Sequence, residues 1–140
     1  MGIIRIKRSD FDAIVSHAKA CLPEEACGLI AGSVDEEERR IEKVYFLENI
    51  DHTNEHFSMN PKDQLTAVRD MRTSGLKPLG NWHSHPETPS RPSAEDIRLA
   101  YDSSASYLIL SLMDPDAPVL HSFHVQGGSA WRDTLEITDI

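Results

Sequence analysis

The chain has 140 residues and a formal net charge of -9 at pH 7. That length suits a single core, so residues 1–140 are expected to form one domain. The negative charge argues against nucleic-acid binding, which requires a basic face. The sequence has neither a run of about 18 apolar residues nor a signal-peptide apolar region, so we expect a cytoplasmic protein that does not engage a membrane.

The first elements predicted are a strand and a helix. Ile4 and Ile6 alternate with polar residues, as in a half-buried strand. The pair Ser9 and Asp12 resembles a capping box and predicts the start of an amphipathic helix. Pro23 ends that helix.

A strand pair is expected next. Residues 26–32 and 41–49 are rich in apolar side chains, and the acidic run 35–38 predicts a solvated turn between them. A polar loop follows, and its histidines, His52 and His56, are expected to face solvent rather than substrate.

The second half alternates helices with strands, which indicates an α/β fold. Its first helix is expected to turn Leu65, Val68 and Met71 toward the core. The predicted elements are a helix that begins at Asn60-Pro61 and ends at Gly75, a strand over 79–85, a helix over 93–101, a hairpin of 107–113 and 119–125, and an edge strand over 131–137.

Two histidines in the predicted strand 79–85 are candidate metal ligands. Side chains alternate along a strand, so His83 and His85 share a face about 6.5 to 7 Å apart, while Ser84 points the other way and is structural. Asp96 adds an oxygen donor, and two histidines with one carboxylate leave one tetrahedral position open, as in catalytic zinc sites. Ser93 and Asp96 also fit a helix capping box, and both interpretations can hold together.

A hydrolytic site also needs a proton acceptor that is not a ligand. Glu24 and Glu25 stand at the head of an apolar run. Alternation places Glu25 on one strand face with Cys27 and Leu29, and Glu24 on the other. We therefore predict Glu25 as the general base.

The other histidines and the cysteines are weaker candidates. His17 is expected on a helix surface, and His121 and His124 face opposite ways on one strand. Cys21 and Cys27 form no C-x-x-C pair and are expected to be buried.

Together, Glu25, the run His83-Ser84-His85-Pro86, Ser93 and Asp96 resemble the JAMM (MPN+) metalloprotease signature, an upstream glutamate followed by H-[ST]-H-P and S-x-x-D. The resemblance implies the MPN fold, an α/β domain with a mixed, curved sheet flanked by helices, akin to cytidine deaminase. It also implies one zinc ion held by His83, His85 and Asp96. Glu25 would be the acid/base, and Ser93 would hydrogen-bond the oxyanion.

The implied activity is zinc-dependent hydrolysis of an amide or isopeptide bond at the C-terminal tail of a ubiquitin-like protein. The compact chain is most similar to small prokaryotic members that act on ubiquitin-like sulfur-carrier proteins. One alternative is a noncatalytic MPN scaffold, although such relatives usually lack the ligands. A RadC-like protein would show H-N-H-P-S-G, and a zinc deaminase would show H-x-E with P-C-x-x-C; this sequence has neither.

Overall fold

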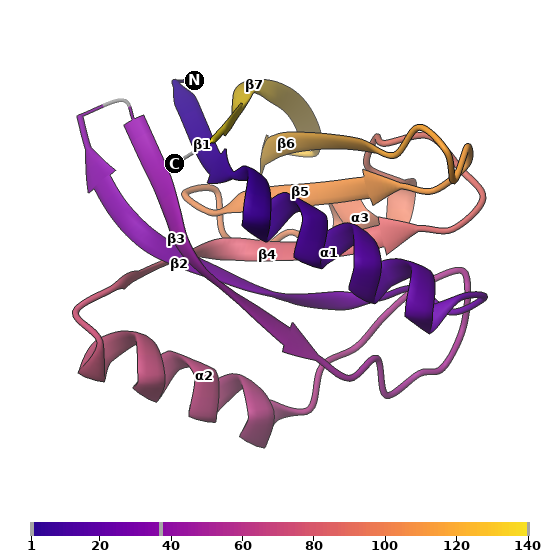
Figure 1. Ribbon diagram of the computed structural model, residues 1–140, viewed down its shortest axis with the longest axis horizontal. Helices are drawn as coiled ribbons and strands as arrows, with labels where there is room; N and C mark the ends of the chain where they lie inside the picture. The colour runs from indigo at the N-terminus through magenta and orange to yellow at the C-terminus, as the bar shows by residue number, and fades with distance from the viewer. Residues whose placement is uncertain (1, 37, 140) are drawn as a thin grey trace.

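The computed structural model describes residues 2–36 and 38–139. Strands and helices alternate along much of this part of the chain (Figure 1). The elements are β1 (Ile3–Lys7), α1 (Arg8–Cys21), β2 (Cys27–Asp35), β3 (Glu38–Leu47), α2 (Pro61–Thr73), β4 (Lys77–His85), α3 (Ala94–Arg98), β5 (Ser106–Ser111), β6 (Val119–Gln126) and β7 (Ser129–Thr138).

The strands close into a barrel in the order β1-β3-β2-β4-β5-β6-β7. The pairs β1·β3, β1·β7 and β4·β5 are parallel, and the others are antiparallel. The predicted mixed α/β arrangement is therefore confirmed. The prediction of an edge strand over 131–137 is wrong, because β7 pairs with β6 on one side and with β1 on the other.

The two longer helices pack on opposite faces of the sheet. Ile14 and Ala18 of α1 join the main core, to which β2 contributes Ile30. The neighbouring Ala31 points to the other face, where it packs with Ala67 and Met71 of α2. In Figure 1, α1 lies in front of β4 and β5 and α3 lies behind them.

The face of β4 turned away from α1 is the one that matters for the site. Trp82 of β4 and Leu108 of β5 are paired in register and both belong to the main core with α1. The next pair, His83 and Ile109, therefore points to the opposite face. The Trp82 indole N–H donates to the Tyr45 carbonyl at 3.1 Å, so this tryptophan is a packing residue.

Two helix predictions need correction. Helix α1 begins at Arg8, and its N-cap, Lys7, makes no side-chain capping bond, so Ser9 is not a cap. The physical reason is that β1 stays paired with β7 as far as Lys7 and the chain turns directly into the helix. In α2 the Asn60 cap is confirmed, but Leu65 is exposed because this helix rests on the sheet through Ala67 and Met71.

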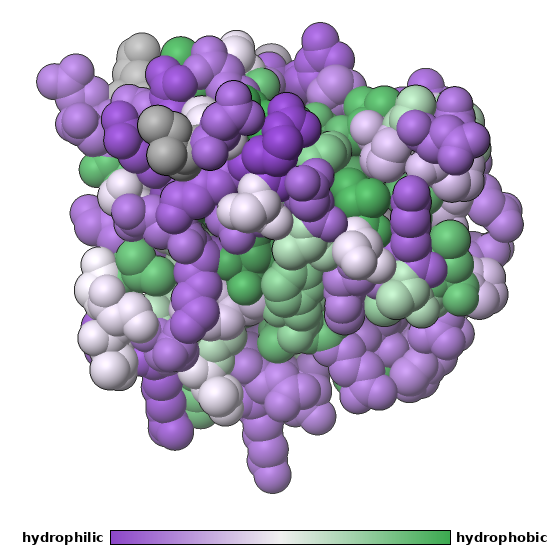
Figure 2. All heavy atoms as spheres, in the orientation of Figure 1, coloured by the Kyte–Doolittle hydropathy of each residue, from purple (hydrophilic) through white to green (hydrophobic). Residues whose placement is uncertain are grey.

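The outer surface is mostly hydrophilic on the face that Figure 2 shows, with a strip of apolar side chains near its middle. None of the helices within the described residues is long and apolar enough to cross a membrane. Both cysteines are free thiols; Cys27 is buried, as predicted, and Cys21 is half-buried.

Candidate metal centre

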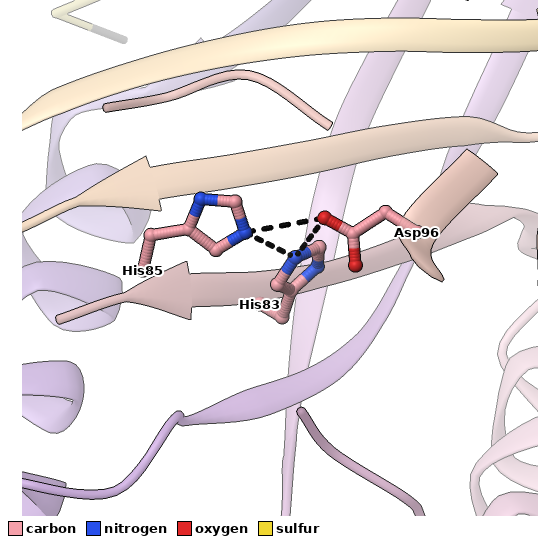
Figure 3. Close-up of side chains that lie close together, drawn as sticks. All are labelled: His83, His85 and Asp96. Carbon is pink, nitrogen blue, oxygen red and sulfur yellow. Dashed lines mark hydrogen bonds and ion pairs between the residues drawn. The ribbon is translucent and has the colours of Figure 1, made fainter. Parts of the chain in front are cut away.

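Three side chains from two elements converge at the end of β4 (Figure 3). His83 Nε2 and His85 Nε2 lie 3.1 Å apart. Asp96 Oδ2, from α3, lies 3.3 Å from the first and 3.2 Å from the second. A triangle of that size has a point about 2 Å from all three atoms, which is the bond length of zinc to nitrogen and oxygen ligands. Within the described residues, these three side chains form the one group of three or more His, Cys, Asp or Glu residues whose donor atoms lie close enough together to hold a metal ion.

Contacts outside the triad orient each candidate ligand. The second ring nitrogen of His85, Nδ1, lies 3.0 Å from the Pro89 carbonyl, which fixes the ring with Nε2 toward the other donors. The His83 ring stacks on Phe57, with ring centroids 4.7 Å apart and 25° between the planes. Both imidazoles are buried.

Asp96 is held by a capping box at the start of α3. Ser93 Oγ accepts a hydrogen bond from the Asp96 N–H at 3.0 Å, and the Ser93 N–H donates to Asp96 Oδ2 at 2.9 Å. The predicted capping box is therefore confirmed, although α3 ends at Arg98 rather than at residue 101. The same bonds aim the Asp96 carboxylate at the two histidines.

The electrostatics of His83 and Asp96 suit metal binding, whereas those of His85 favour its protonated form in the metal-free protein. Burial lowers the pKa of His83 against the opposing pull of Asp96, which favours the neutral imidazole. Burial alone would raise the pKa of Asp96, but hydrogen bonds with His83 and His85 lower it well below its usual range. For His85, burial works to lower the pKa, but Asp96 and the Pro89 carbonyl outweigh it and raise the pKa. A neutral imidazole and an ionised carboxylate are the forms that coordinate a cation.

Glu25 lies beside this triad, two residues before β2. Its side chain is only 4% exposed, and burial raises its pKa to about 8, against the opposing charge of His85. Its Oε1 is buried without a hydrogen-bond partner in the described part of the chain. Glu24, by contrast, is only half-buried, and its carboxylate contacts His52 Nδ1 at 3.0 Å. A buried carboxyl with a raised pKa next to a metal centre is suited to moving protons.

A polar side chain that sequence reasoning missed holds the backbone of Glu25. Asn49 is buried, and its Nδ2 donates to the carbonyls of Glu25 at 3.0 Å and His56 at 3.1 Å. Its Oδ1 accepts from the N–H groups of Asp51 at 3.1 Å and Ser58 at 3.2 Å. Asn49 thus joins the loop over residues 48–60 to the candidate base. The sequence holds a partial signal of this role: an asparagine in a polar loop is typical of an Asx turn, in which the side-chain oxygen accepts from the N–H group two residues later.

The same loop supplies Phe57, which sequence reasoning also missed. It is a large apolar residue within a polar stretch, and that contrast was the available signal. The expectation that the loop histidines face solvent is correct for the exposed His52. It is incomplete for His56, which lines a pocket with Phe57.

Ser84 links the ligand strand to the segment that carries Glu25. Its Oγ accepts a hydrogen bond from the Ala26 N–H at 2.8 Å, and its own N–H donates to the Ala26 carbonyl at 2.9 Å. The side chain is fully buried and points away from the two histidines. This agrees with the predicted structural role.

The remaining histidines lie apart from the triad. His17 is not on an open helix surface as predicted; it is half-buried, with its ring centroid 4.9 Å from that of Phe46. His124 pairs with Asp133 at 3.0 Å, and His121 lies against Phe123.

Comparison with known proteins agrees with this geometry. Residues 7–126 match the family profile Prok-JAB, the prokaryotic homologs of the JAB domain. The chain is 28% identical to the CysO-cysteine peptidase of Mycobacterium tuberculosis over 137 residues, which cover 98% of this chain and 92% of that protein. It is 30% identical to the desampylase of Haloferax volcanii over 105 residues, covering 71% and 74% respectively.

Solved structures show the same fold. The solution structure of a Desulfitobacterium hafniense protein matches with a TM-score of 0.91 at 47% identity, covering 98% of this chain and 94% of that one. A JAB1/MPN domain protein from Archaeoglobus fulgidus matches with a TM-score of 0.59 at 21% identity, covering 96% and 99%. The second likeness concerns the fold alone.

Proposed function

Since this chain belongs to the prokaryotic homologs of the JAB domain and is a JAMM-type hydrolase, we propose that it is a zinc-dependent peptidase or isopeptidase. The proposed substrate is the C-terminal tail of a ubiquitin-like sulfur-carrier protein. The names of two relatives, a CysO-cysteine peptidase and a desampylase, support hydrolysis of a carrier conjugate.

The observation that carries the proposal is the convergence of three metal-donor atoms next to a buried carboxyl oxygen of Glu25, which has no hydrogen-bond partner among the described residues. His83, His85 and Asp96 have the donor set and spacing of a catalytic zinc site. When bound there, a zinc ion supplies Lewis acidity, which polarises a scissile carbonyl and acidifies water.

The residues around the metal position divide the remaining work. Glu25 accepts the proton of the attacking water and delivers it to the nitrogen of the leaving amine as the C–N bond breaks. Ser93 accepts one hydrogen bond from Asp96 and keeps its hydroxyl proton, which it donates to the oxyanion. Asn49 and Ser84 hold the segment that carries Glu25 in place.

The test uses ubiquitin-like sulfur-carrier proteins whose Gly-Gly tails are extended by one residue or conjugated to a lysine. The zinc-loaded protein is expected to release the carrier with a free Gly-Gly end, detected by its mass, and a chelator is expected to stop the reaction. A protein that binds zinc stoichiometrically but cleaves none of these substrates would be a scaffold, and the proposal would be wrong.

Three variants separate metal binding from proton transfer. Glu25→Gln is expected to keep stoichiometric zinc and lose at least about 100-fold in kcat/KM, the scale of a missing general base. Asp96→Ala is expected to lose the zinc as well. Glu24→Gln is the matched control, because this neighbouring carboxylate is partly exposed and contacts His52 instead of the triad, and the variant is expected to retain activity.

A further inference from the structure

A pocket of about 200 Å³ opens beside the candidate metal centre. It lies on the face of the sheet turned away from α1, because Ile109 of β5, the register partner of His83, forms part of its wall. The triad residues His83 and Asp96 line one part of it. The apolar lining comes from Phe57, Pro92, Leu99, Ile109 and Val125.

Contact with two candidate ligands places this pocket next to the scissile bond. A side chain bound there therefore belongs to a residue that directly flanks the bond. The acyl-side residue of a Gly-Gly tail is glycine, which has no side chain to bind. This step rests on the proposed function, and it leaves the amine-side residue as the occupant.

The residues that line the pocket indicate which class of substrate side chain it would bind. Phe57, Leu99 and Val125 offer apolar surface to a bound side chain. Such a surface favours the substrate side chain that removes more apolar area from water on binding. Glu95 also lines the pocket beside Asp96, so an acidic side chain would meet like charge there. We propose that this pocket binds the side chain of the amine-side residue and selects an apolar side chain, of about the size of cysteine to leucine, over an acidic one.

Lysine in an isopeptide linkage is the competing occupant. In that substrate the leaving amine is at the tip of a flexible methylene chain, and the pocket would take methylenes instead of a branched side chain. The two cases differ in which substrate is cleaved faster, so one series of substrates distinguishes them.

The experiment measures kcat/KM for a carrier whose tail reads Gly-Gly-X, with X as glycine, alanine, cysteine, leucine, aspartate or lysine, together with an isopeptide-linked lysine. Leucine is expected to exceed glycine and aspartate by at least about 10-fold, the usual discrimination of an apolar pocket. Equal rates for all X, or fastest cleavage of the isopeptide, would overturn the inference. Failure of every substrate would instead count against the proposed function.

Two leucines provide a matched pair of variants, because both are on the surface of helical segments. Leu99 is 47% exposed at the C-cap of α3 and lines the pocket, whereas Leu65 is 50% exposed on α2 and does not. Leu99→Ala is expected to lower the leucine-to-glycine ratio of kcat/KM by at least about fourfold, the value of one buried methylene. Leu65→Ala is expected to leave that ratio unchanged.

A positive charge at position 99 is expected to improve the cleavage of a substrate that is otherwise disfavoured. Leu99→Arg is expected to raise the aspartate-to-leucine ratio, because a guanidinium at the pocket would offset the carboxylate of Glu95. If neither variant of Leu99 moves these ratios while both proteins remain folded and bind zinc, the side chain of X is bound elsewhere and the inference is wrong.

Discussion

Replacing Glu25 with glutamine should stabilise the metal-free protein in alkaline solution. Burial raises the pKa of this carboxyl to about 8 from an ordinary value of 4.5. A tenfold change in a protonation equilibrium amounts to about 1.4 kcal/mol, so keeping the ionised side chain buried costs at most about 5 kcal/mol. Glutamine has the same shape and carries no charge at any pH.

The sign of the pH dependence follows from the raised pKa. Below pH 4.5 the carboxyl is protonated in both the folded and the unfolded chain, and burial of a charge costs nothing. Between pH 4.5 and about 8 the unfolded chain ionises while the folded one keeps its proton, so the wild type loses stability as the pH rises. Above that range the full cost is present. Between pH 5 and pH 8.5 the wild type should lose up to about 4 kcal/mol relative to the glutamine variant.

The assay is urea unfolding of both proteins at pH 5 and pH 8.5 in the presence of a chelator. Glu24→Gln serves as the control, because Glu24 is the neighbouring carboxylate but is partly exposed, so its removal should change the slope with pH far less. Some relaxation around the charge is expected to reduce the effect, but at least about 1 kcal/mol should remain. If the free energies of unfolding of wild type and Glu25→Gln change in parallel with pH, burial of the ionised Glu25 carboxylate does not destabilise the fold and the reasoning is refuted.

Three further predictions concern the surroundings of the site. Asn49→Asp keeps the side-chain oxygen that accepts from Asp51 and Ser58 but loses the N–H donor to the Glu25 carbonyl. The value of kcat should therefore fall at least about 10-fold, while KM and zinc content change little. The control is Asn54→Asp, because Asn54 is exposed. An equal loss of kcat in both variants would show that Asn49 does not act through Glu25. Ser84→Ala leaves the buried Ala26 N–H without its partner and should lower the free energy of unfolding by about 1 to 3 kcal/mol, whereas Ser84→Thr should restore it. Finally, added zinc should raise the melting temperature more at pH 7.5 than at pH 5, because its ligands bind it only when deprotonated; equal shifts would contradict this.

Local spacing accounts for most of what could be predicted about the site. His83 and His85 share a face because the strand period is two, and that geometry requires nothing from the rest of the chain. The capping box of Ser93 and Asp96 spans one helical turn and is local as well. The roles assigned to these residues and to Glu25 remain predictions, which the variants above will test.

Contacts between distant segments account for what the sequence did not show. Asn49 holds Glu25 across 24 positions of the chain, and Phe57 stacks on a histidine that local patterns place in a separate strand. Neither pairing has a periodic signature, because it depends on how one loop packs over the sheet. The preference for Glu25 over Glu24 followed from strand alternation, but its burial beside the triad depends on the loop that covers it.

The sequence by itself determined the strand and helix types, the shared face of the two histidines and the cap that aims Asp96, because each depends on neighbours within one turn or one strand. Only the tertiary structure decided that β7 closes a barrel against β1, that Asn49 anchors Glu25 and that an apolar pocket adjoins the triad. These features arise when residues far apart in the chain bury surface and satisfy backbone hydrogen bonds together, and such pairings leave no regular pattern in the sequence.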